Sequence, residues 1–100
     1  MTKHALSVAT VGLGRYRVNI AAATATSHDV TLPDNYLATL GLTGVPAERM
    51  IEESFRFLLE REPNTSILRE FSLPLIERYF PEYRAVIQQR LRPISGTPAP

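Results

Sequence analysis

The sequence holds few side chains that could do chemistry. Its only imidazoles are those of His4 and His28, and it contains no cysteine, which excludes a thiolate nucleophile, a disulfide and a cysteine zinc site. Neither histidine stands at a spacing typical of metal ligands or near a strained turn that exposes a serine nucleophile. Asp29 follows His28 directly, in a pair that is typical of a turn. We therefore expect no metal site, no catalytic residue and no enzymatic activity.

Carboxylates occur close together at two places, Glu52-Glu53 and Glu60 with Glu62. On a helical wheel most of them fall on the solvated side beside arginines. Such neighbours keep a carboxylate ionised, whereas a general acid needs a raised pKa. Glu62 falls closer to the apolar side, near the predicted end of its helix. We expect none of these groups to act as a general acid or base.

Two glycines and an arginine in the segment Val11-Gly12-Leu13-Gly14-Arg15 superficially suggest a phosphate-binding loop. The dinucleotide-binding pattern needs a third glycine and a helix after the loop. Here Tyr16–Ile20 predicts a strand instead, so a hairpin turn explains both glycines. We expect no cofactor.

Residues 5–32 predict a small antiparallel sheet of two or three strands. Over residues 15–20 the apolar Tyr16, Val18 and Ile20 alternate with polar residues, as in a strand with one solvated face. Residues 21–27 fit either a strand or a loop, since the alanines favour a helix and the threonines an extended chain. Residues 27–29 predict a turn before a short third strand at 30–32.

The rest of the chain predicts three to five short helices that prolines start or end. The first is expected over Pro33–Leu40, and the strongest over Pro46–Glu62, where apolar residues recur on one side. A short helical turn is predicted over Ser66–Glu70. Residues 73–91 form either one kinked helix or two helices that break at Pro81, and the break is favoured because proline removes a helical hydrogen bond.

These elements together predict an α+β fold in which the helices cover one face of the sheet. We expect one domain over residues 1–92 and a disordered tail over residues 93–100, which is rich in proline and small residues. The centre of the core is predicted to be Tyr16–Ile20 and the helix 46–62. The side chains expected to close this core are Ile76, Tyr79, Phe80 and Ile87.

The net charge of +1 is too small to predict nucleic-acid binding by itself. Arg15 and Arg17 nevertheless share one face of the predicted strand, where they could contact phosphates. The acidic helix 46–62 would repel the same phosphates if it lay on that side. No signal peptide and no stretch long enough to span a membrane is seen, so we expect a cytoplasmic protein without membrane contact.

Aromatic residues give the best indication of function. The chain has four tyrosines and four phenylalanines, and all except Tyr16 follow residue 35, on short helices with little room to bury them. Phe57 and Phe71 are our candidates for exposure to a partner, since interfaces favour aromatic residues. The alternative is that Phe57 packs under the C-terminal helices.

The sequence therefore predicts a small non-enzymatic protein–protein interaction or regulatory module. Its partner would be another protein or a second copy of the chain. A regulator that binds nucleic acid through Arg15 and Arg17 is the alternative. The identity of the partner and the biological process are not readable from the sequence.

Overall fold

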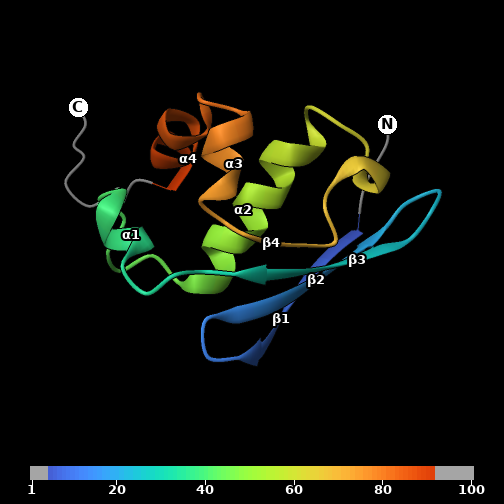
Figure 1. Ribbon diagram of the computed structural model, residues 1–100, viewed down its shortest axis with the longest axis horizontal. Coiled ribbons are helices and arrows are strands. Elements are labelled where there is room, and N and C mark those ends of the chain that lie inside the picture. Colours follow the sequence, from blue (N-terminus) through green and yellow to red (C-terminus); the bar gives the residue numbers. More distant parts are fainter. Residues whose placement is uncertain (1–4, 92–100) are drawn as a thin grey trace.

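The computed structural model describes residues 5–91, in which a four-stranded sheet carries all described helices on one face (Figure 1). The strands are β1 (Ala5–Gly12), β2 (Arg15–Ala21), β3 (Thr26–Thr31) and β4 (Glu70–Ser72), in the order β1-β2-β3-β4. Neighbours among the first three strands are antiparallel, whereas β4 runs parallel to β3. The α+β class is confirmed, but the expected antiparallel sheet of two or three strands is wrong, because a fourth strand makes the sheet mixed.

Tight links join the first three strands. Leu13 and Gly14 form the turn between β1 and β2, and Gly14 has a φ of 68°, which glycine adopts without steric penalty. The backbone N–H of Leu32 donates to the Gly14 carbonyl at 2.8 Å. The two glycines therefore serve a hairpin, as predicted. Residues 22–25 form the next link, so the segment 21–27 is mostly loop with strand at both ends.

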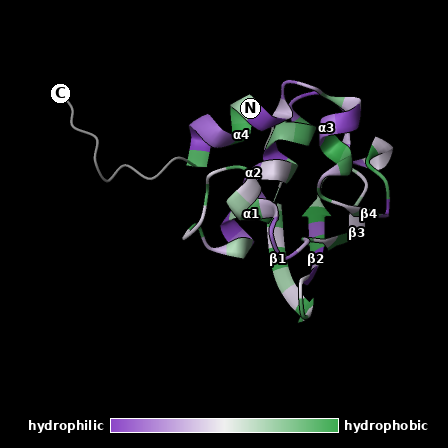
Figure 2. Ribbon diagram, turned by 60° about the vertical axis from the view of Figure 1, so that its left-hand side comes forward, coloured by the Kyte–Doolittle hydropathy of each residue, from purple (hydrophilic) through white to green (hydrophobic). Residues whose placement is uncertain are grey.

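The alternation predicted for residues 15–20 is confirmed. Hydrophilic and hydrophobic residues alternate along β2 (Figure 2), and its buried residues are Tyr16, Val18 and Ile20. The turn predicted at residues 27–29 is wrong, because these residues lie within β3, opposite Arg17, Val18 and Asn19 of β2. Pairing with β2 holds this segment extended despite the turn-forming pair His28-Asp29.

The helices are α1 (Tyr36–Thr39), α2 (Ala47–Leu59), α3 (Leu75–Tyr79) and α4 (Tyr83–Leu91), and η1 (Asn64–Ser66) is a 3₁₀ turn. Pro81 lies between α3 and α4, which confirms the favoured break. The helical turn predicted over residues 66–70 is wrong. After η1 the chain is extended, and β4 begins at Glu70.

The core lies between the sheet and the helices, with β2 and α2 at its centre as expected. Val18, Met50, Ile51 and Phe55 have at most traces of exposed surface. Of the side chains expected to close the core, Ile76 and Ile87 are buried and Phe80 is half-buried, but Tyr79 is 65% exposed. The break at Pro81 separates α3 from α4, so one continuous apolar stripe no longer extends over both helices.

Buried hydroxyl groups fasten α4 to α2. The Ser54 hydroxyl donates to the Met50 carbonyl at 2.7 Å, and it lies 2.6 Å from the Tyr83 hydroxyl. Because the Ser54 hydroxyl proton is donated to the Met50 carbonyl, the Tyr83 hydroxyl must donate to Ser54 Oγ. Burial raises the pKa of Tyr83, in agreement with a phenol that keeps its proton. This contact fixes the position of the chain that follows α3.

The predicted tail over residues 93–100 and His4 lie outside the described residues. The single-domain prediction for residues 1–92 stays a prediction. Within residues 5–91, no helix combines the length and the apolar character needed to cross a membrane.

Candidate functional site

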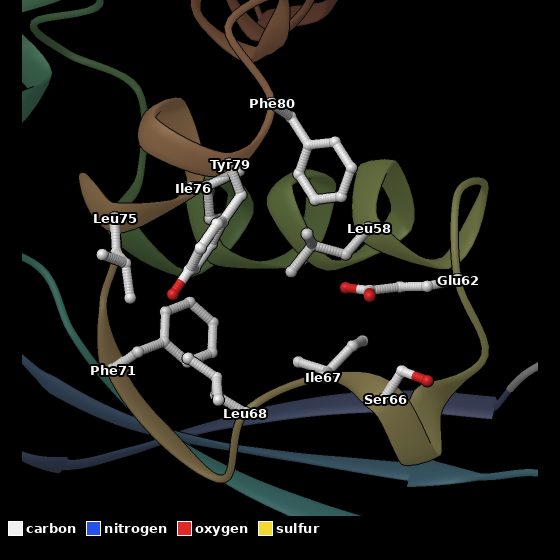
Figure 3. A pocket seen from close by; sticks show the side chains of 10 residues that line it. All are labelled: Leu58, Glu62, Ser66, Ile67, Leu68, Phe71, Leu75, Ile76, Tyr79 and Phe80. Carbon is white, nitrogen blue, oxygen red and sulfur yellow. The ribbon is translucent and has the colours of Figure 1, made fainter.

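An apolar groove lies between the C-terminal half of α2, the segment after it, and α3 (Figure 3). We call it the α2–α3 groove. Its volume is about 410 Å³, large enough for one or two side chains of a partner. Its lining residues are Leu58, Glu62, Ser66, Ile67, Leu68, Phe71, Leu75, Ile76, Tyr79 and Phe80.

Three prolines shape this groove. Pro63 prevents α2 from continuing, so the chain leaves the helix and turns back through η1 to reach the sheet as β4. Pro74 stands just before α3, where its fixed φ fits the start of a helix. Pro81 ends that helix after one and a half turns. The segment 67–73, which includes β4 at the edge of the sheet, therefore contains no helix, and the groove lies along it.

The aromatic end of the groove is formed by Phe71 and Tyr79 (Figure 3). Phe71 is half-buried, and its ring centroid lies 5.9 Å from that of the buried Phe55. Its contact with Phe55 holds one side of the ring in the core while the other side lines the groove. Tyr79 lies above this ring and Leu68 below it in Figure 3, and both side chains are exposed. This end offers the contiguous apolar surface that a partner can cover.

Glu62 brings a carboxylate into the opposite end of the groove. Figure 3 shows this carboxylate between the side chains of Leu58 and Ile67. Burial raises the pKa of Glu62, and no cation among the described residues offsets this effect. The groove is therefore an apolar surface with one acidic group in its wall.

Substitution of Glu62 by glutamine tests this environment through the pH dependence of stability. Because the folded pKa is raised, the native state holds this proton more readily than the unfolded chain does. The wild type is therefore expected to lose stability relative to Glu62→Gln as the pH rises through the ordinary value of 4.5 and the raised pKa above it. Urea denaturation of both proteins at acidic and neutral pH measures the difference.

Glu60→Gln is the matched control, because a hydrogen bond from Arg90 lowers the pKa of Glu60. Removal of the Glu60 carboxylate should lower stability at neutral pH and leave it unchanged in acid. This pH dependence is opposite in sign to the one expected for Glu62→Gln. A stability difference between wild type and Glu62→Gln that does not vary with pH would contradict a carboxylate whose pKa is raised by partial burial.

A buried polar network holds the outer wall of the groove. His28 Nδ1 donates to the Leu68 carbonyl at 2.8 Å, since a carbonyl oxygen only accepts, and the other ring nitrogen lies 2.9 Å from the Thr26 hydroxyl. Asn64 Nδ2 lies 2.8 Å from the same hydroxyl oxygen and 2.8 Å from the Thr24 carbonyl. The network connects β3 to the segment that carries Ile67 and Leu68. His28 is therefore a structural residue in this conformation.

Phe57, predicted as a partner contact, is fully buried, so the expectation that it is exposed is wrong. Its ring packs edge-on against Phe80 and Tyr83, with centroid distances of 5.9 and 5.2 Å. The guanidinium of Arg61 covers it at 3.6 Å. The alternative that Phe57 packs under the C-terminal helices is correct, and it leaves this residue no surface for a partner.

The open face of the sheet carries the two arginines expected to contact nucleic acid. Arg15 and Arg17 are both exposed there, as the alternation in β2 predicts. Arg17 Nε donates to Asp29 Oδ1 at 2.8 Å, and this hydrogen bond lowers the pKa of Asp29. The pairing places an anion beside Arg17, so this face has less positive charge to offer a phosphate than the sequence suggests.

Neither a search for metal sites nor the comparisons with known proteins give a further indication of function. Across the described range 5–91, no three of the residue types that ligate metals come together as a metal site. The chain matches no protein-family model, no curated protein and no solved structure.

The α2–α3 groove was not predicted from the sequence, because its residues come from four separate segments. The sequence offers two local signals for it, the position of Glu62 towards the apolar side of the helical wheel and the choice of Phe71 as a candidate partner contact.

Proposed function

We propose that this protein is a small non-enzymatic interaction module that binds another protein through the α2–α3 groove. The observation that carries the proposal is the groove itself, with Phe71 in its floor and the exposed Leu68 and Tyr79 at its rim. Aromatic residues around a concave apolar surface are typical of the anchor pockets of interfaces. Of the two phenylalanines expected to bind a partner, Phe71 keeps this role in the proposal. The cytoplasmic location expected from the sequence stays a prediction.

Capture of partners from a lysate of the native host tests this proposal when variants are compared. Tyr79→Asp places a charge at the rim of the groove and is expected to lose the partner, because desolvating a carboxylate opposes apolar contact. Leu13→Asp is the control, since Leu13 is 99% exposed in the β1–β2 turn, far from the groove in the sequence and in the fold. Proteins retained equally by both variants would contradict binding through the groove.

The nucleic-acid alternative is separated by nuclease treatment of the same lysate. Partners that disappear after treatment, and whose retention falls steeply with salt, would favour a regulator that acts through Arg15 and Arg17. Under the proposal, partners survive the nuclease. The ion pair of Arg17 with Asp29 is the observation that makes this alternative the weaker one.

Self-association, the other form of partner expected, has a specific surface in the edge strand β1. This strand is eight residues long and contains no charged residue and no proline, the features that keep exposed edges from pairing. A second copy adding its own β1 would extend the sheet. Ala9→Lys is then expected to shift the protein from dimer to monomer in sedimentation, whereas Ala38→Lys on α1 is not. A wild type that sediments as a monomer would rule out this pairing.

A further inference from the structure

The acidic residues near the end of α2 differ in one respect, which is whether a cation accompanies them. Glu60 accepts from Arg90 at 2.7 Å and from Arg61 at 3.2 Å, and Arg61 also reaches Glu82 at 3.1 Å. Glu62 has no such partner among the described residues, although burial disfavours its charge. Arg61 and Arg90, the cations beside Glu60, are thus engaged outside the groove, while the carboxylate of Glu62 inside it forms no ion pair among the described residues.

A carboxylate in an apolar wall is costly unless something compensates its charge. Aliphatic side chains border it on both sides, Leu58 above and Ile67 below in Figure 3. The stem of a lysine or arginine can lie along such side chains while its head reaches the carboxylate. A partner anion would instead be repelled at this end of the groove.

We propose that the α2–α3 groove selects a partner segment in which a large apolar side chain is accompanied by a lysine or arginine, with Glu62 as the residue that recognises the cation. This inference rests on the proposed function and adds the chemistry of the partner. The apolar side chain occupies the end formed by Leu68, Phe71 and Tyr79, and the cation occupies the end formed by Glu62. Charge complementarity therefore sets the orientation of the segment in the groove.

Three small molecules with one shape and different charge test the inference: 4-phenylbutylamine, 4-phenylbutanol and 4-phenylbutyrate. Each is titrated into the ¹⁵N-labelled protein at neutral pH, and its Kd is taken from amide shifts. The shifts are expected to cluster at Glu62, Leu68, Phe71 and Tyr79. We expect the amine to bind about fivefold more tightly than the alcohol, the effect of one partly exposed ion pair, and the acid to bind most weakly.

Glu62→Gln should bring the amine and the alcohol to equal Kd values and leave the alcohol's own Kd unchanged. Glu60→Gln removes the same charge from the neighbouring solvated side and should leave the preference intact. Equal Kd values for amine and alcohol on the wild type would overturn the recognition of a cation while leaving an apolar groove in place. Amide shifts confined to other surfaces with all three molecules would overturn both the inference and the proposed function.

Selection of random peptides on the folded protein extends the test to the class of partner proposed. Wild-type protein is expected to enrich peptides with an aromatic or aliphatic anchor near a lysine or arginine, and Glu62→Gln to keep the anchor while losing the cation. Enrichment of acidic peptides, or of the same basic residues by both proteins, would overturn the role of Glu62.

Discussion

Phe57→Ala is expected to destabilise the fold by about 3–5 kcal/mol, the range for truncating a fully buried phenylalanine. The ring fills the space between α2 and α4, where it contacts Phe80 and Tyr83, and Arg61 covers its face. Alanine would leave a cavity there and remove the surface on which the guanidinium rests, a contact worth about 0.5–1 kcal/mol. Denaturation in urea measures the change as a lower midpoint at an unchanged slope.

Phe71→Ala is the matched comparison, because it removes the same side chain from a half-buried position. Truncating Phe71 removes about half as much buried apolar surface as truncating Phe57, so the expected destabilisation is only about 1–2 kcal/mol. Partner binding should be weakened more by Phe71→Ala than by Phe57→Ala, since Phe71 lines the groove and Phe57 does not reach it. Equal destabilisation by the two substitutions would contradict the assignment of one residue to the core and the other to the groove.

The contrast between these two phenylalanines shows that the local sequence pattern predicts a helix but does not decide whether a residue at the edge of its apolar face is buried. A helical wheel puts Phe57 at the edge of the apolar stripe of α2, a position that is buried or exposed according to what packs beside it. Here Phe80 and Tyr83, more than twenty residues away, cover it. The burial of Phe57 is therefore a tertiary effect that no window around residue 57 contains.

Elements with a strong period of their own were predictable. The alternation over residues 15–20 predicted β2, and the apolar face after Pro46 predicted α2, which begins and ends within a few residues of the expected bounds. The break at Pro81 followed from the geometry of proline alone. In each case one local rule outweighed the alternatives.

The fourth strand was not predictable in this way. β4 has only three residues, too few to show an alternation, and it pairs in parallel with β3, so that Val30 lies opposite Phe71. Such a pairing depends on the whole path of the chain through α1, α2 and η1. The same path brings the parts of the α2–α3 groove together, which is why the groove could not be predicted although Phe71 was a candidate partner contact.

His28→Leu is expected to destabilise the fold by about 2–4 kcal/mol although it places an apolar side chain in a buried position. His28 lies on the core side of β3, with its ring centroid 5.5 Å from that of Phe55. Leucine retains much of the volume but makes no hydrogen bond, so the Leu68 carbonyl loses its donor and the Thr26 hydroxyl proton loses its acceptor, although Asn64 still donates to the Thr26 oxygen. Each unsatisfied buried polar group costs about 1–3 kcal/mol.

The hydrogen-bond network also predicts which part of the structure His28→Leu destabilises. The segment carrying Leu68 is tied to β3 by His28 and, one residue further along, by the Asp29 N–H donating to the Arg69 carbonyl at 2.7 Å. Loss of the first tie should speed hydrogen exchange of the amides at residues 67–71 and weaken binding in the α2–α3 groove, since Leu68 forms its rim. Thr26→Val keeps the Leu68 contact but removes the partner of His28 Nε2, so it should lower stability by about 1–3 kcal/mol and leave that exchange slow. If His28→Leu instead preserved both stability and slow exchange, the network would have no part in holding the groove open, and its wall would depend on the backbone pairing of β3 with β4 alone.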